Sequence, residues 1–121
     1  MAAIRGIVLF GHGSRDPLWR KPIELVAARI REHDAQVLVT CAYLELTEPD
    51  LATATLQLLA QGARSIRVVP MFLGLGQHAR DDLPRLVAEL KARHPQIQLT
   101  LQPAIGEDAR LIELMARIAL Y

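Results

Sequence analysis

Apolar residues occur along this chain in two alternating patterns. Four short runs consist mostly of apolar residues and have the length of buried β-strands; they span residues 4–10, 36–42, 65–73 and 97–101. The segments that follow them carry apolar side chains at intervals of three and four residues, which is the period of a helix with one buried side. The alternation predicts the order βαβαβαβα, the pattern of a parallel sheet wrapped by helices.

Each helical segment has one apolar stripe of the kind that faces a core, and we expect this of the C-terminal segment too. The stripes are Ile23, Val26, Ala27 and Ile30; Leu51, Ala54, Thr55 and Leu58; Leu83, Leu86, Val87 and Leu90; and Leu111, Leu114, Met115 and Ile118. The first helix is expected to begin near Lys21, because Pro22 would break a helix that started earlier. Thr47, with Asp50 three residues later, is typical of a helix start, and Gly62 is placed as a helix-terminating glycine.

The strand runs differ in how apolar their two sides are. The first three are apolar on both sides or nearly so, whereas residues 96–102 alternate strictly between polar and apolar, which indicates an edge strand. A chain of 121 residues fits one hydrophobic core. We therefore predict a single α/β domain over residues 1–121, with a parallel sheet of about four strands, helices on both faces and right-handed crossovers.

Composition excludes several classes of partner. The formal net charge is +1 and no run of like charge stands out, so neither nucleic acid nor a membrane surface is expected as a partner. The N-terminal apolar run is too short to span a membrane and lacks the cleavage pattern of a signal peptide, which predicts a cytoplasmic protein. Cys41 is the single cysteine. Its apolar setting suggests a buried structural thiol, and an internal disulfide or a multi-cysteine metal cluster is excluded.

The unusual residues gather in the loops that follow the strands. His12 stands between two glycines after the first strand, Glu45 follows the second, and a glycine-containing loop leads from the third to His78. Ligands bind beyond the carboxyl ends of parallel strands, so two imidazoles and a carboxylate are expected around one cleft. The other two histidines, His33 and His94, are expected at the opposite edge of the sheet.

The same loops allow other interpretations. A histidine beside a glycine can simply cap a turn, and a lone loop carboxylate is more often solvated. Residues 74–79 match the G-x-G-x-x-A dinucleotide fingerprint, but they follow the third strand rather than the first, and no acidic ribose ligand ends the next strand. A nucleotide binder stays open as an alternative. Residues 11–14 lack the G-x-S-x-G pattern of serine hydrolases, which disfavours nucleophilic catalysis.

Three segments carry a resemblance to a known family. Residues 9–15 read Leu-Phe-Gly-His-Gly-Ser-Arg, residues 42–49 read Ala-Tyr-Leu-Glu-Leu-Thr-Glu-Pro, and residues 69–73 read Val-Pro-Met-Phe-Leu and lead to His78. In this order they resemble the sirohydrochlorin cobaltochelatases in their short form, and the resemblance runs along nearly the whole chain. The stretch from His78 to Pro84 agrees with an acidic-proline helix start of that family, whereas residues 74–77 are less typical.

The resemblance implies an enzyme that inserts a divalent metal ion into sirohydrochlorin, which with cobalt is a step of cobalamin biosynthesis. It implies that His12 is a metal ligand and the proton acceptor, and that His78 is the second metal ligand. The residues implied to contact the tetrapyrrole are Glu45, Leu73, Gly74, Leu75, Gly76, Gln77 and His78. Cobalt, or nickel or iron in its place, is then a substrate, and no tightly bound cofactor is expected. Long members of the family contain two such halves, so the resemblance also implies a homodimer.

The residue types suit this chemistry. Metallation must remove two pyrrole protons and deliver a divalent ion without trapping it in a closed four-ligand site. Two imidazoles leave coordination positions open and suit cobalt, nickel or ferrous iron, and an unperturbed imidazole, with a pKa of about 6.5, accepts a proton at neutral pH. Arg15 or Arg80 could pair with the peripheral carboxylates of the substrate. Besides the nucleotide binder, two alternatives stay open: ferrochelation toward siroheme, and a non-catalytic protein that binds metal or tetrapyrrole.

Overall fold

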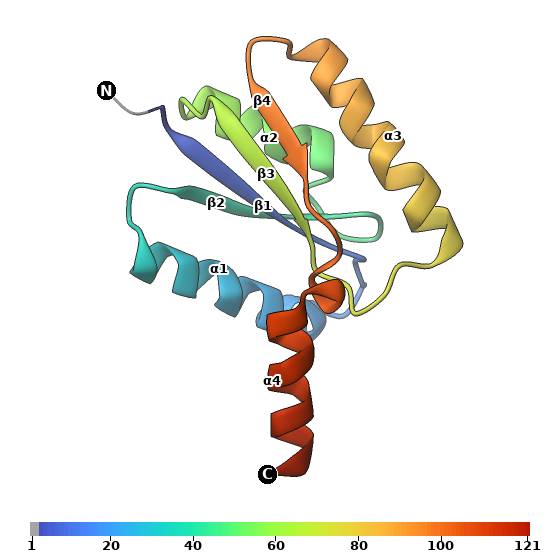
Figure 1. Ribbon diagram of the computed structural model, residues 1–121. Helices are drawn as coiled ribbons and strands as arrows, with labels where there is room; N and C mark the ends of the chain where they lie inside the picture. Colours follow the sequence, from blue (N-terminus) through green and yellow to red (C-terminus); the bar gives the residue numbers. More distant parts are fainter. Residues whose placement is uncertain (1–2) are drawn as a thin grey trace.

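The computed structural model describes residues 3–121, which form a four-stranded parallel sheet with helices on both faces (Figure 1). The strands are β1 (Arg5–Gly11), β2 (Leu38–Tyr43), β3 (Ser65–Pro70) and β4 (Gln98–Leu101). Their order across the sheet is β2-β1-β3-β4, and each neighbouring pair is parallel. The predicted fold class is confirmed, and the four strands fall within two or three residues of the apolar runs.

Helices follow each strand in the predicted alternation. They are the 3-10 helix η1 (Pro17–Arg20), α1 (Lys21–His33), α2 (Leu51–Ala60), α3 (Gln77–Arg93), the 3-10 helix η2 (Ile105–Glu107) and α4 (Ala109–Leu120). Helix α1 covers one face of the sheet, and α2 and α3 cover the other (Figure 1). Among residues 3–121, no helix is both long enough and apolar enough to cross a membrane.

The core lies in two layers, one on each face of the sheet. The larger layer packs α2 and α3 against the sheet and includes Phe10, Leu58, Ile66, Val68, Leu83 and Val87. The smaller layer lies under α1 and consists of Leu9, Ile23, Ala27, Val39, Tyr43 and Val69. Successive strand residues point to opposite faces, so the apolar runs of β1 and β3 supply both layers.

Both ends of the strand order are edges, and the sequence indicated only one of them. Strand β4 is an edge strand, as its alternation predicted. Strand β2 is the other edge, although its run resembles that of an interior strand. Its residues are apolar like those of an interior strand because α1 and α2 contact β2 from both faces. The Arg31 guanidinium of α1 also donates a hydrogen bond to the Val39 carbonyl of β2 at 3.1 Å.

Two of the three predicted helix boundaries are confirmed. Helix α1 begins at Lys21, and Gly62, which follows α2, has a φ of 101°, the left-handed conformation that glycine adopts without strain. The predicted start of α2 at Thr47 is wrong. Asp50 is the N-cap, because its carboxylate accepts a hydrogen bond from the Thr53 amide at 2.8 Å.

The expectation that the C-terminal helix faces the core is wrong. Helix α4 extends away from the sheet (Figure 1), and none of its residues is buried. Its predicted stripe is largely open to solvent, with Leu114 52% and Ile118 68% exposed. Helical periodicity shows that one side of a helix is apolar, but it does not show which surface covers that side.

Candidate functional site

The loops after β1 and β2 are joined backbone to backbone. The Leu44 amide donates to the Gly11 carbonyl at 3.0 Å, and the Glu45 amide donates to the His12 carbonyl at 3.1 Å. Gly13 makes this approach possible: its φ is 105°, and a Cβ atom there would lie 1.7 Å from the Glu45 carbonyl oxygen. The glycine after His12 is therefore required by the contact with the second loop.

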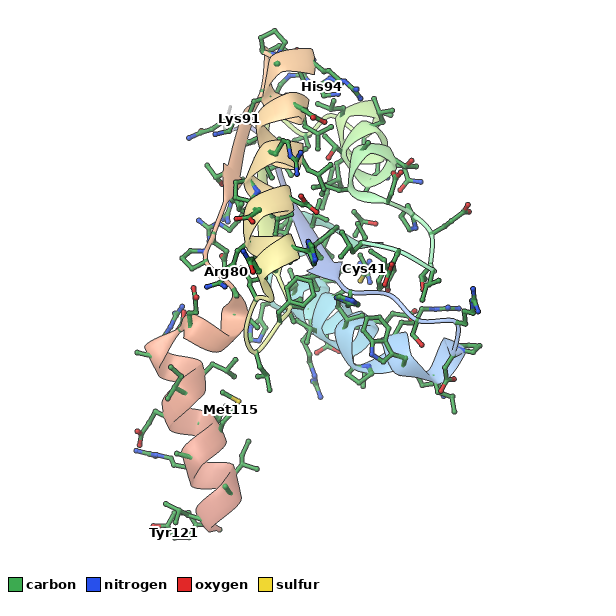
Figure 2. The ribbon with its side chains drawn as sticks, turned by 90° about the vertical axis from the view of Figure 1, so that its right-hand side faces the viewer. Cys41, Arg80, Lys91, His94, Met115 and Tyr121 are labelled. Carbon is green, nitrogen blue, oxygen red and sulfur yellow. The ribbon has the colours of Figure 1, made fainter. Side chains whose placement is uncertain are left out.

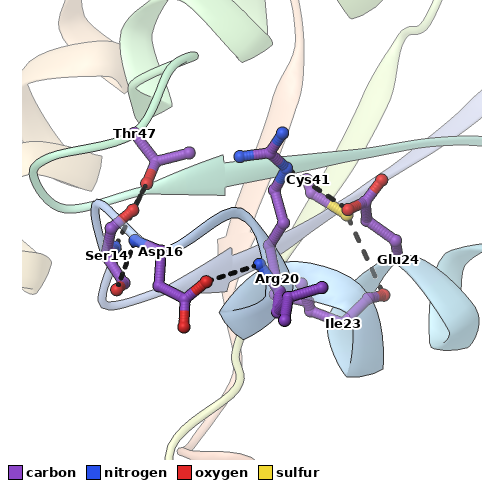
Figure 3. Close-up of polar contacts among 8 residues, drawn as sticks. Ser14, Asp16, Arg20, Ile23, Glu24, Cys41 and Thr47 are labelled. Atoms are coloured by element: carbon purple, nitrogen blue, oxygen red, sulfur yellow. Dashed lines mark hydrogen bonds and ion pairs between the residues drawn. The ribbon is translucent and has the colours of Figure 1, made fainter.

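A side-chain bond further along the loops closes the same junction (Figure 3). The Thr47 hydroxyl donates to the Ser14 carbonyl at 2.7 Å and accepts from the Ser14 amide at 3.1 Å. Between Glu45 and Thr47 the chain makes a tight turn, in which the Thr47 amide donates to the Glu45 carbonyl at 2.7 Å. Leu46, at the centre, has a φ of 62°, an uncommon value for a branched side chain that persists where neighbouring contacts fix it.

This junction places His12 beside Glu45. The Nε2 atom of His12 lies 3.6 Å from the Oε1 atom of Glu45, and both side chains are 56% exposed. At that separation the two side chains are close neighbours, but they are not hydrogen-bonded. The His12 ring also meets the Phe72 ring edge to face, with centroids 6.0 Å apart. His12 is thus held between a carboxylate and an aromatic ring, with most of its surface open.

His78 is placed differently. It is the second residue of α3, and its side chain is exposed. Among residues 3–121, no three histidine, cysteine, aspartate or glutamate side chains are arranged to hold a metal ion. The structure therefore brings His12 and Glu45 together, but it does not join His78 to them in one ligand group.

The start of α3 also differs from the helix start that the resemblance implied. The helix begins at Gln77, with Gly76 as its N-cap, so His78 lies in the first turn. Pro84 lies inside the helix rather than at its start. The roles of His12, Glu45 and His78 remain predictions.

The predicted substrate loop between β3 and α3 is open on its outer side. Leu73 is 71% exposed, and a Cβ atom added at Gly74 or Gly76 would meet nothing within 4 Å. Leu75 is half-buried and, with Arg80, lines a hollow of about 280 Å³. Gln77 is exposed.

The inner side of this loop rests on η2. The Gly106 amide donates to the Phe72 carbonyl at 2.9 Å, and a Cβ atom at Gly106 would lie 1.9 Å from the Leu73 carbonyl oxygen. The loop is therefore attached at its base and free along its outer edge.

The hollows near the site do not enclose it. A hollow of about 510 Å³ follows the loop after β2 and is lined by Glu45 and Thr47 among others. A narrower one of about 220 Å³ lies between α2 and α3 and is lined by Phe10 and Leu44 among others. Neither is lined by His12 or His78. A flat ligand at this edge would therefore be covered on one side only.

The thiol of Cys41 is not a candidate metal ligand. Cys41 is half-buried, and its sulfur lies 3.9 Å from the Ile23 carbonyl oxygen, to which the thiol donates (Figure 3). Burial raises the pKa of this thiol, opposed in part by a hydrogen bond from Tyr43. Burial likewise raises the pKa of Tyr43 to about 12. Since metals bind the thiolate, Cys41 is the structural thiol that its setting suggested, though less buried than expected.

Three residues at this edge were not identified as site residues from the sequence. Thr47 was interpreted as a helix start, and no local pattern shows that its hydroxyl reaches Ser14, 33 positions earlier. Phe72 lies in one of the segments that carried the resemblance, which was the only available signal. Gly106 falls in a 3-10 helix that the apolar pattern did not predict.

Comparisons with known proteins agree with this fold. The family model described as CbiX matches residues 6–119. The chain is 34% identical over 91 residues to a sirohydrochlorin cobaltochelatase of Methanocaldococcus jannaschii, covering 75% of this chain and 64% of that protein. It is 33% identical over 120 residues to one of Saccharolobus solfataricus, covering 93% and 91%. For the M. jannaschii protein and a Methanococcus aeolicus protein of the same name, the match spans 64% and 59% of their length.

Solved structures of similar proteins divide into single-length and double-length chains. A CbiX protein from Marinobacter aquaeolei matches with a TM-score of 0.81 and 33% identity, over 95% of this chain and 93% of that chain. The sirohydrochlorin chelatase SirB from Bacillus subtilis subspecies spizizenii, in complex with cobalt, matches with a TM-score of 0.78 and 28% identity, over 96% of this chain and 50% of that chain. SirB from Bacillus subtilis with Fe3+ matches with a TM-score of 0.77 and 26% identity, over 94% and 45%.

Proposed function

Because the chain belongs to the CbiX family, we propose that it is a metal chelatase that inserts divalent cobalt into sirohydrochlorin. The observation that carries the proposal is the match over 93% of the chain to a protein of similar length named sirohydrochlorin cobaltochelatase. The site supports it, because an exposed imidazole and a carboxylate 3.6 Å apart can handle both a proton and a cation. Cobalt is a substrate in this reaction, and we expect no tightly bound cofactor.

The His12–Glu45 pair supplies the chemistry that metallation needs. An imidazole nitrogen binds a divalent ion or accepts a pyrrole proton, although one nitrogen cannot do both at once. The neighbouring Glu45 carboxylate, 3.6 Å away, offers acceptor oxygens to the same ion or to an N–H group of the ring. Because both side chains are 56% exposed, the pair leaves coordination positions open and releases the ion to the ring.

His78 is proposed as the second metal ligand, acting from the neighbouring loop. Among residues 3–121 it does not form one ligand group with the His12–Glu45 pair, so we propose that the two act together on a ligand that contacts both loops. A tetrapyrrole has the breadth for this, and we propose that it lies along residues 73–77 at the edge of the sheet. Arg80, which lines the hollow beside Leu75, is then suited to pair with a peripheral carboxylate, and Arg15 is a second candidate.

We further propose that the active form is a homodimer in the cytoplasm. The open hollows at this edge offer one wall, whereas ligand sites usually enclose most of their ligand. This chain matches 50% of the SirB chain, and the family resemblance implies that long members contain two such halves. A lone, half-buried cysteine suits a reducing compartment.

Iron insertion is the second candidate function, because one structural relative is a SirB with Fe3+. The test is to incubate the purified protein with sirohydrochlorin and Co2+, Ni2+ or Fe2+, and to follow the absorption spectrum of the ring. We expect metallation faster than the uncatalysed rate, fastest with cobalt. Binding of the metal or the ring without faster metallation would instead indicate a carrier. A faster rate with iron than with cobalt would indicate a ferrochelatase of siroheme synthesis.

A further inference from the structure

The His12 imidazole lacks the hydrogen bond that usually orients a functional histidine. A metal-binding or proton-accepting histidine normally has one ring nitrogen held by a carboxylate or a backbone carbonyl. Among residues 3–121 no such bond to the His12 ring is formed, and Glu45, itself 56% exposed, is too far away for one at 3.6 Å. The torsion that turns an imidazole about its Cβ–Cγ bond is soft, with broad preferred ranges. Another contact must therefore set the orientation of this ring.

The ring of Phe72 is placed to set it. It meets the His12 ring edge to face, with centroids 6.0 Å apart and an interplanar angle of 85°. Both values lie in the range that aromatic pairs prefer. Turning the imidazole away from this angle forfeits the edge-to-face contact, so a flat neighbour restricts its rotation without a hydrogen bond.

Phe72 is itself fixed from the core. Its ring meets the Phe10 ring with centroids 6.2 Å apart at 76°, and Phe10 is 2% exposed in the core layer under α2 and α3. The Met71 amide, one residue before Phe72, donates to the Phe10 carbonyl at 2.8 Å. On the other side, the Gly106 amide donates to the Phe72 carbonyl at 2.9 Å. An exposed imidazole is thus connected to a rigid core through one intervening ring.

The same residue stands at the base of the open loop. Leu73, which follows it, is 71% exposed. Helix η2 approaches this base so closely that a Cβ atom at Gly106 would lie 1.9 Å from the Leu73 carbonyl oxygen. Any displacement of the base would move Phe72, and with it the ring that His12 contacts. The place of residues 73–77 and the orientation of His12 are therefore linked through Phe72.

We propose that Phe72 is a positioning residue, whose ring holds the His12 imidazole in one orientation at a fixed place relative to the loop of residues 73–77. Metallation needs a nitrogen aimed at the centre of the bound tetrapyrrole, and an imidazole that rotates freely is seldom so aimed. The Phe72 side chain has no group that binds a metal ion or a proton, so its part is geometric. The consequence for the rate rests on the proposed chelatase function, whereas the orientation of His12 by Phe72 does not.

The first experiment observes the His12 ring by NMR, in the protein without metal or substrate. We expect nuclear Overhauser contacts between the ring protons of His12 and Phe72. Carbon-13 relaxation, which reports motion on the picosecond to nanosecond timescale, should show an ordered His12 ring in the parent and a mobile one in Phe72→Leu. The ring of His94, at the end of α3 remote from Arg80 (Figure 2), should move equally in both proteins. Equal motion of the His12 ring in the parent and Phe72→Leu would overturn the proposal.

The second experiment measures steady-state metallation of sirohydrochlorin with cobalt. Phe72→Leu should lower kcat roughly 10-fold with little change in KM, because it alters geometry and not binding. Phe72→Tyr keeps the ring and should restore both kcat and the order of the His12 ring. A rise in KM alone in Phe72→Leu would make Phe72 a support of the substrate loop only, and would overturn the proposal. So would a Phe72→Tyr protein that has an ordered His12 ring and the low kcat of Phe72→Leu.

A matched control separates positioning from a general loss of stability. Leu59, at the end of α2, packs against the same core layer as Phe72 but follows from the opposite edge of the sheet. Leu59→Ala should lower the urea midpoint of unfolding and leave kcat and the motion of the His12 ring at the parent values. A fall in kcat equal to that of Phe72→Leu would assign both effects to stability and would overturn the proposal.

A further variant tests the link to the loop without changing either ring. Gly106→Ala displaces the base of the loop, because the added Cβ atom overlaps the Leu73 carbonyl oxygen. We expect the His12 ring to become more mobile. Gly74→Ala, in the same loop, meets no atom within 4 Å and should leave that motion unchanged. An unchanged His12 ring in folded Gly106→Ala protein would overturn the link between the loop and His12.

The two readouts separate this proposal from the proposed function. Ring motion is measured without metal or substrate, so a His12 ring that loosens in Phe72→Leu supports the proposal even in a protein that does not metallate. Absence of metallation in the parent would refute the proposed function alone. A metallating parent whose Phe72→Leu variant keeps both the ordered ring and the full rate would overturn the role of Phe72 and leave the function intact.

Discussion

The two loops that carry the candidate histidines lie at one edge of the sheet but are held in opposite ways. The loop of His12 is joined to the next loop by two backbone bonds and by Thr47, and Gly13 is needed for the approach. The loop that leads to His78 has two glycines with nothing near them and an exposed Leu73. We infer that the first loop is organised before a ligand arrives, whereas the second is free to adjust to one.

The largest expected effect comes from removing the imidazoles. We expect His12→Ala to lower the chelation rate at least 100-fold, the usual loss when a general base is removed. His78→Ala should also abolish metallation if it is the second ligand. Both side chains are exposed, so the free energy of unfolding should change by less than about 0.5 kcal/mol.

Steady-state rates with sirohydrochlorin and cobalt, together with urea unfolding curves, check this prediction. The exposed His33→Ala variant, changed at the end of α1, serves as the matched control. If His12→Ala metallates at the parent rate, the assignment of the site to this edge is wrong. If His78→Ala metallates at the parent rate and His12→Ala does not, the site consists of the His12–Glu45 pair without His78.

The next effect tests the difference in backbone constraint. Gly13→Ala forces a side chain into the left-handed region and against the Glu45 carbonyl, and the combined cost is roughly 2–5 kcal/mol. Gly74→Ala meets no neighbouring atom and should cost less than about 0.5 kcal/mol. Urea unfolding of both variants gives the comparison directly. Equal stabilities would mean that the first loop is no more constrained than the second.

A smaller effect is expected from Thr47, which positions the first loop without touching the metal. Thr47→Val removes both hydrogen bonds to Ser14 while keeping the shape of the side chain, and should cost about 1–3 kcal/mol. The chelation rate should fall roughly 10-fold, since small displacements of a catalytic group are costly. Thr47→Ser keeps the hydroxyl and should restore the rate. Failure of serine to restore it would assign the loss to packing rather than to position.

The smallest effect concerns the cap of α2, outside the two loops. The hydrogen bond from the Thr53 amide lowers the pKa of Asp50. The ionised cap therefore stabilises the folded protein fully above the unfolded-state pKa of about 3.9, and this stabilisation is lost as pH falls through the folded-state pKa. Asp50→Ala should therefore cost about 1 kcal/mol at pH 7. The difference in the free energy of unfolding between the parent and Asp50→Ala should shrink toward pH 3. Urea midpoints at both pH values measure it, and a pH-independent difference would exclude the charged cap as its cause.

The candidate site was only partly predictable from the sequence. The strand pattern correctly placed His12 and Glu45 at one edge, because the loops after parallel strands share that edge. It could not show that Glu45 lies 3.6 Å from His12, or that His78 does not join them in one ligand group among residues 3–121. That difference depends on bonds between residues distant in sequence, such as those of Thr47 to Ser14.

Local patterns by themselves determined the strand and helix order, the parallel sheet, the edge position of β4 and the start of α1 at Lys21. These features depend on alternation, helical period and proline geometry, which act within a few residues. Only the tertiary structure decided that β2 is an edge, that Thr47 bonds to Ser14 instead of starting α2, and that α4 leaves the domain. An apolar stripe specifies that a surface must be covered, but the cover is chosen by packing among segments far apart in the chain.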